Sequence, residues 1–163
     1  MSWKFENAAP LIGTITEGNC WTGRHMLYSN VSLNRIMKYD PTTGLVDIFK
    51  ENTEGINGLN FDIKGNLYGC ASEGRKIVRL ENNGNMTTII ERLDGRRINS
   101  PNDLAITPTG SIYFSDRVGD SSPNVGINHS SIISAEPTGD GEYRCFRRTY
   151  DTTMPNGLLF SLD

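Results

Sequence analysis

Four short segments of the sequence begin with a side chain that can offer an oxygen ligand. Their first residues, separated by 40, 45 and 54 positions, are Glu17, Asn57, Asn102 and Asn156. One carboxylate with several amide oxygens is a hard ligand set, which suits Ca²⁺, Mg²⁺ or Mn²⁺ better than softer metals. The four residues could therefore hold a divalent cation if the fold brought them together. The alternative is that these Asn residues and the Gly residues near them only form turns, because both tolerate left-handed backbone.

The four segments are the starts of a repeated unit, which is the reason to expect them at equivalent places in the fold. Four positions after each first residue stands a large apolar residue: Trp21, Phe61, Ile106 and Phe160. In three of the units an apolar residue followed by Tyr begins ten positions in: Leu27-Tyr28, Leu67-Tyr68 and Ile112-Tyr113.

Each unit is expected to form four short antiparallel strands. The apolar runs are β-branched or aromatic, the breaks between them carry Gly, Asn, Pro and Thr, and no segment shows a sustained helical stripe. Four-stranded units repeating every ~40–50 residues are typical of β-propeller blades. The sequence thus predicts an all-β propeller with units starting near 17, 57 and 102. An ordinary β-sandwich with coincidental spacing is the alternative.

The sequence is expected to be one partial propeller domain spanning residues 1–163. The third unit is longer than the others, and its excess falls in residues 117–130, which read as a loop. A fourth unit begins at Asn156 and is cut off after its first strand. Because a lone strand cannot cover a blade face, we expect a truncated propeller whose remaining blades are missing.

Composition excludes several function classes. The formal net charge of −3 and the pI near 5.4 give no basic surface for nucleic acid. No apolar run approaches the ~20 residues of a membrane helix, and the first residues do not form a signal peptide. We therefore expect a soluble cytoplasmic protein that binds neither nucleic acid nor membrane.

Several motifs resemble one known family. The sequence is similar to the senescence marker protein, gluconolactonase and luciferin-regenerating enzyme family, closest to its bacterial and fungal gluconolactonases. The resemblance runs along nearly the whole chain and rests on these motifs: Thr16-Glu17-Gly18, Asn57-Gly58-Leu59, Asn99-Ser100-Pro101-Asn102-Asp103-Leu104, Gly110-Ser111-Ile112-Tyr113-Phe114-Ser115-Asp116 and Pro155-Asn156-Gly157-Leu158.

This resemblance implies a six-bladed propeller, with about three four-stranded blades in this chain, that hydrolyses a sugar lactone. It implies one divalent metal ion in the channel, with Ca²⁺ first and Mg²⁺, Mn²⁺, Zn²⁺ or Fe as alternatives. By motif, Glu17 and Asn156 are metal ligands, Asn102 is a ligand or a substrate contact, and Asp103 is a neighbouring group that supports them. The family's remaining ligand, also its proposed base, is an Asp from a later blade, beyond Asp163.

Two departures from the family pattern leave alternatives open. Asn19 stands where the family usually has Pro, which bears on ligand geometry, and Arg117-Val118-Gly119 replaces a Pro-Pro-Tyr stretch, which bears on substrate preference. The same propeller could support a phosphotriesterase-type hydrolase, or bind a metal or a partner without turnover. Within this chain, Asp103 and Asp116 are the nearest candidates for a base by motif, although such residues more often lie in turns or at the surface.

Overall fold

The computed structural model describes residues 2–8, 13, 15–119 and 129–161, and within them the chain is all-β. Three four-stranded antiparallel sheets and one two-stranded sheet are present in this part of the chain. The first sheet contains β1 (Thr16–Trp21), β2 (Met26–Asn30), β3 (Arg35–Tyr39) and β4 (Val46–Glu51). The second contains β5 (Ile56–Phe61), β6 (Leu67–Ala71), β7 (Lys76–Leu80) and β8 (Met86–Ile90). The third contains β11 (Ser100–Ile106), β12 (Ile112–Arg117), β13 (Ser131–Pro137) and β14 (Tyr143–Arg147).

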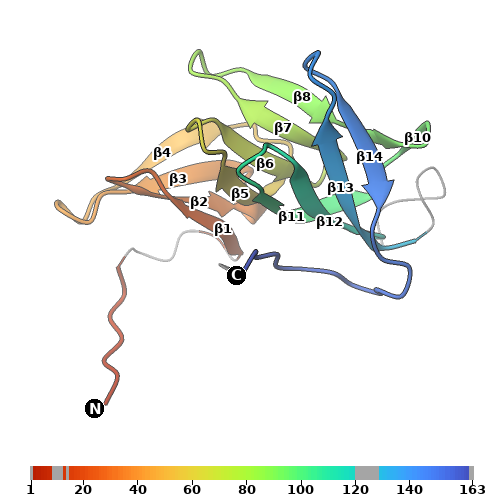
Figure 1. Cartoon of the computed structure of the whole chain (residues 1–163). Coiled ribbons are helices and arrows are strands. Elements are labelled where there is room, and N and C mark those ends of the chain that lie inside the picture. The colour runs from red at the N-terminus through yellow and green to blue at the C-terminus, as the bar shows by residue number, and fades with distance from the viewer. Residues whose placement is uncertain (1, 9–12, 14, 120–128, 162–163) are drawn as a thin grey trace.

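The strands of each sheet pair in sequence order, from the first strand to the fourth. The three first strands lie next to one another, since β5 packs against both β1 and β11. Figure 1 shows these strands at the centre of the molecule and β4, β8 and β14 at its periphery. This arrangement is propeller-like, so the all-β prediction is confirmed. The sheets do not form the two-layered sandwich that was the alternative.

The hydrophobic core lies between neighbouring sheets. One cluster joins the first sheet to the second, with Leu27, Ile36, Ile56 and Val78 among its buried members. A second cluster joins the second sheet to the third around Phe114, which is fully buried. The apolar residue of each apolar-Tyr pair is the first buried residue of the second strand in its sheet, which explains why these residues recur. Packing between units, rather than within one unit, therefore stabilises the fold.

Two details differ from the sequence-based expectation. A two-stranded hairpin of β9 (Arg92–Leu93) and β10 (Arg96–Arg97) precedes the third sheet, and no sequence pattern indicated it. The segment 156–160, expected as the first strand of a fourth unit, is not a strand in the structure. Strand formation needs a hydrogen-bonded neighbour, and no described strand pairs with this segment. Most of the predicted loop, residues 120–128, lies outside the described residues.

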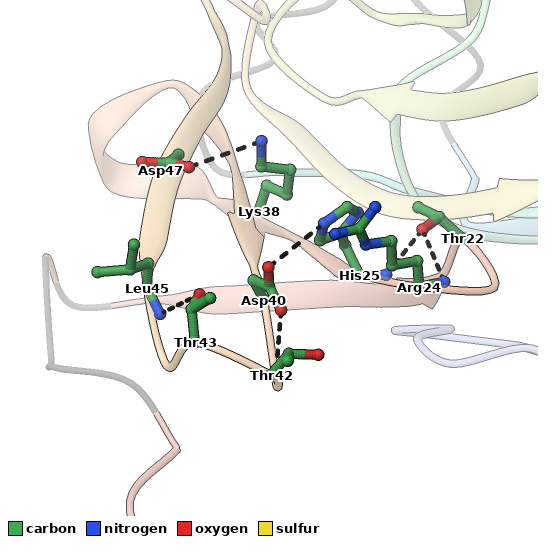
Figure 2. Close-up of polar contacts among 9 residues, drawn as sticks. All are labelled: Thr22, Arg24, His25, Lys38, Asp40, Thr42, Thr43, Leu45 and Asp47. Carbon is green, nitrogen blue, oxygen red and sulfur yellow. Dashed lines mark hydrogen bonds and ion pairs between the residues drawn. The ribbon is translucent and has the colours of Figure 1, made fainter.

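Figure 2 shows two hairpin turns of the first sheet, which join β1 to β2 and β3 to β4 at the end of the sheet opposite the start of β1, here called the turn end. The Thr22 hydroxyl oxygen accepts hydrogen bonds from the backbone N–H groups of Arg24, at 3.3 Å, and His25, at 2.9 Å. The Asp40 carboxylate accepts one from the backbone N–H of Thr42 at 2.8 Å, and its other oxygen lies 3.8 Å from His25 Nε2. Polar groups at this end are thus paired within or between adjacent turns.

Across the described ranges, the model holds no helix that is both long and apolar enough to cross a bilayer. The only helical element in these ranges is a three-residue 3₁₀ turn, Val31–Leu33. The cytoplasmic location stays a prediction.

Candidate cation-binding site

The N-terminal ends of β1, β5 and β11, here called the strand heads, line one pocket together with the segment after β14. Its volume is about 290 Å³, and all four residues singled out by their spacing line it: Glu17, Asn57, Asn102 and Asn156. Asp103 lines it as well. Glu17 comes from β1, Asn57 from β5 and Asn102 from β11, so three sheets contribute. Residues up to 139 positions apart in the sequence are therefore brought to one place.

A β-bulge occurs at the head of each first strand. In β5 the register shift falls at Asn57-Gly58, and in β11 it falls at Asn102-Asp103. In β1 it falls one residue later than the repeat would place it, at Gly18-Asn19. A bulge sets two residues against one on the neighbouring strand and re-aims their side chains, which is why bulges are frequent beside active sites. Here they let oxygen-bearing side chains face the pocket instead of alternating across the sheet.

Asn102 is the most buried of the four head residues, with 7% of its surface exposed. Its Oδ1 atom is buried and has no hydrogen-bond partner among the described residues. Glu17 and Asn156 are exposed, and Asn57 is intermediate. An unpaired buried amide oxygen costs free energy unless a ligand satisfies it. The most buried side chain of the pocket thus presents an unused acceptor.

The charge of the pocket favours a cation. Among its described lining residues, Glu17 and Asp103 carry carboxylates, and no Lys or Arg is present. Within the described ranges no three His, Cys, Asp or Glu side chains gather into a group that could hold a metal ion by themselves. Amide oxygens must therefore complete any ligand set, which matches the hard-oxygen chemistry of Ca²⁺ or Mg²⁺. The donor set fits such an ion.

Serine residues that the sequence analysis did not single out hold two of the strand heads. The Ser29 hydroxyl, at the end of β2, donates a hydrogen bond to the Asn57 carbonyl of the next unit at 2.7 Å. The Ser72 hydroxyl, just after β6, likewise donates to the Pro101 carbonyl of the third unit. In both cases a serine of one unit fixes the strand head of the next. Ser29 lies within β2 whereas Ser72 follows β6, so the two serines do not occupy equivalent positions of the repeat, and no sequence pattern marked them.

Asp116 lies at the same end but does not line the pocket. It is fully buried, and its Oδ2 accepts hydrogen bonds from the backbone N–H of Asn99, at 2.9 Å, and from the Asn99 side-chain amide, at 3.0 Å. Burial raises the pKa of Asp116 to about 6, although the hydrogen bonds from Asn99 and Ser100 act in the opposite direction. This residue therefore secures the segment before Asn102 rather than meeting a substrate.

A larger cleft, of about 740 Å³, lies at the turn end between the first and second sheets. Its walls include Leu27, Phe61 and Leu67, and its rim carries Lys50 and Glu81. Lys50 Nζ donates to the Gly84 carbonyl at 2.7 Å, so its charge is already engaged. Among the described residues that line this cleft, no buried polar atom lacks a partner. The smaller pocket at the strand heads is the better candidate.

A family model described as the SMP-30/Gluconolactonase/LRE-like region matches residues 15–163. The chain therefore belongs to this family, as the motifs predicted.

Relatives of known structure and curated relatives agree with this membership. The gluconolactonase of Zymomonas mobilis is 25% identical over 168 residues, which cover 91% of this chain and 46% of that protein. A gluconolactonase from Xanthomonas campestris has a similar structure, with a TM-score of 0.77 at 26% identity over 85% of this chain and 48% of the other. A luciferin-regenerating enzyme shares the fold, with a TM-score of 0.58 at 16% identity over 83% and 48% of the two chains. This chain thus spans about half the length of these relatives.

Proposed function

We propose that this chain provides the cation-binding strand heads of an enzyme that opens a sugar lactone with the help of one divalent metal ion. The observation that carries the proposal is the convergence of four oxygen-bearing heads on one pocket, where the buried Asn102 oxygen has no partner. Family membership and the gluconolactonase relatives support lactone hydrolysis. Ca²⁺ is the first candidate, ahead of Mg²⁺, Mn²⁺, Zn²⁺ or Fe, because every candidate ligand atom is an oxygen.

Each of these residues would have a different role in the site. Glu17 and Asn156 would bind the ion from opposite ends of the chain, and Asn102 would complete the ligands or contact the substrate. A divalent cation held by these residues would supply positive charge beside the lactone carbonyl oxygen. In the balanced reaction, water adds to that carbon, the ring C–O bond breaks, and the ring oxygen takes a proton to give a hydroxy acid.

The base that removes a proton from water is not found in this pocket. Both oxygens of Asp103 accept backbone hydrogen bonds, from Leu104 at 2.9 Å and from Leu158 at 3.0 Å. Asp116 is fully buried away from the pocket. We propose, as the family resemblance implies, that the base is a carboxylate from a part of the protein beyond this chain.

Substitution of the proposed ligands tests this function. Glu17→Ala and Asn156→Ala should each abolish metal uptake, measured by elemental analysis, and lactone opening, measured by proton release. Asp47→Ala, at an exposed ion pair with Lys38 in the first sheet, is the matched control and should change neither. Unchanged metal content in both ligand variants would refute the site. These activity measurements need the protein together with the part that carries the base; metal uptake without lactone opening in that unmodified protein would instead favour a non-catalytic metal-binding role.

A further inference from the structure

One position of the repeat breaks its own pattern. The residue that follows each strand head is Gly in three units and Asp in the other; the four residues are Gly18, Gly58, Asp103 and Gly157. The repeat therefore indicates a place where a side chain is normally excluded. The third unit has a carboxylate there.

Close contact between strand heads explains two of the three glycines, Gly18 and Gly58; at Gly157 the nearest atom to an added Cβ would be Asp103 Oδ2 at 3.8 Å. A Cβ atom on Gly18 would lie 2.2 Å from the Asn57 carbonyl oxygen, and one on Gly58 would lie 2.5 Å from Asp103 Oδ1. Both distances are far below van der Waals contact, so neighbouring heads approach too closely for a side chain. The Asp103 carboxylate lies in the space that Gly58 leaves open.

From this position Asp103 reaches the next unit. Its Oδ1 accepts a hydrogen bond from the backbone N–H of Leu104, and its Oδ2 accepts one from the backbone N–H of Leu158, 55 residues away. The backbone N–H of Asp103 itself donates to the Ser115 hydroxyl at 3.0 Å. The carboxylate is therefore held on the third sheet while it binds the segment that contains Asn156.

That segment is not held by strand pairing, because residues 155–161 form no strand in the structure. An edge-to-face contact between Phe160 and Tyr113, with ring centroids 5.3 Å apart, also joins it to the third sheet. A hydrogen bond to a charged acceptor is stronger than one between neutral groups. The position of Asn156 should therefore depend strongly on Asp103.

We propose that Asp103 is a positioning residue, which fixes Asn156 in the pocket that Asn102 also lines by accepting a hydrogen bond from the Leu158 N–H. Its effect on cation binding rests on the proposed function, whereas its effect on the segment 156–160 does not. Asp103 contacts neither cation nor substrate in this proposal. Its carboxylate holds the segment in place, although the segment is not paired as a strand.

Hydrogen exchange at the Leu158 amide tests the attachment directly, with or without a cation. In Asp103→Gly, which installs the residue found in the other units, protection at Leu158 should fall by about tenfold to hundredfold. Asp103→Asn keeps one acceptor and the side-chain shape, so its loss should be smaller. Protection of the Phe114 amide in β12 should stay unchanged in both variants, as should Leu158 protection in Asp47→Asn. Unchanged Leu158 exchange in Asp103→Gly would overturn the proposal.

Calcium titration tests the consequence for the site. The Ca²⁺ dissociation constant should rise by about tenfold or more in Asp103→Gly, less in Asp103→Asn, and not in Asp47→Asn. Faster Leu158 exchange with an unchanged dissociation constant would overturn the positioning role. If the unmodified protein bound no divalent ion, the proposed function would fail, while the exchange experiment would still decide whether Asp103 holds the segment.

Discussion

Polar groups are paired differently at the two ends of the strands. In the turns of the first sheet, polar side chains bind backbone close in sequence, as in the contacts of Thr22 with His25 and of Asp40 with Thr42 (Figure 2). At the head end, hydrogen bonds also join different units across 28 to 55 residues, as for Ser29 with Asn57 and Asp103 with Leu158. The head end also keeps the unpaired oxygen of Asn102.

This difference indicates which end can bind a ligand. Turns that satisfy themselves are stable locally and leave no acceptor available. The heads depend on contacts between units and tolerate bulges and an unpaired oxygen, both of which lower stability unless a ligand compensates. The same kind of substitution made at the two ends should therefore change the free energy of unfolding by different amounts.

The largest difference in unfolding free energy between the two ends should come from replacing one Gly by Ala at each end. In Gly58→Ala the new Cβ would lie 2.5–2.8 Å from atoms of Asp103 and Asn102, two of them backbone atoms that cannot move freely. We expect a loss of about 3 kcal/mol or more in unfolding free energy. In Gly65→Ala nothing lies within 4 Å, and only the left-handed backbone, at φ +83°, opposes the change. Its cost should be about 1–2 kcal/mol. Equal urea midpoints for the two variants would contradict the close approach of the heads.

The two ends should also respond to pH with opposite signs. Burial raises the pKa of Asp116 to about 6, so its folded form favours the proton, and stability decreases as the pH rises toward and through that value. Between about pH 4.5 and about pH 7.5 the loss should be roughly 2 kcal/mol. At the turn end, the backbone N–H of Thr42 lowers the pKa of Asp40, so that stability is lost as the pH falls through this lowered value.

Urea unfolding across this pH range checks the prediction. Asp116→Asn should remove the loss of stability between about pH 4.5 and about pH 7.5, because the variant has no carboxyl to ionise. Asp40→Asn should leave that loss in place and remove only the contribution that Asp40 makes at lower pH. A loss between about pH 4.5 and about pH 7.5 that persists in Asp116→Asn would assign it to another group.

The smallest difference should come from deleting one hydroxyl at each end. Ser29→Ala removes a fully buried donor to the Asn57 carbonyl and should cost about 1–2 kcal/mol. Thr22→Ala removes an exposed acceptor in a turn and should change stability by less than about 0.5 kcal/mol. Chemical denaturation measures both. A larger cost for Thr22→Ala would reverse the proposed ranking of the two ends.

Sequence patterns predicted the elements well where the signal is local. The apolar-Tyr pairs marked the second strands, and runs such as Met86–Ile90 marked fourth strands that the structure contains. The spacing of the four head residues predicted that they meet, and all four line one pocket. Whether they bind a metal ion stays a prediction, as do the six blades of the whole protein.

What sequence could not show depends on contacts between units. A bulge is invisible in a pattern that alternates, so the shift at Asn102-Asp103 had no signal. The segment after Asn156 reads as a strand because its residues match the repeat, yet no neighbour pairs with it. The function of Asp103 follows only when Leu158 is seen beside it. Contacts that distant in sequence are set by packing.

We propose that the strand heads form a cation site in which the oxygen of Asn102 is left without a partner until an ion binds. Urea unfolding with and without Ca²⁺, in the unmodified protein and in Asn102→Leu, tests this proposal. We expect Ca²⁺ to raise the midpoint of the unmodified protein, because a ligand that binds only the folded state stabilises it. Asn102→Leu should be at least as stable without Ca²⁺, since the unpaired oxygen is gone, and should gain nothing from the ion. An equal rise with Ca²⁺ in both proteins would exclude Asn102 as a ligand, and no rise in the unmodified protein would contradict a cation site at the strand heads.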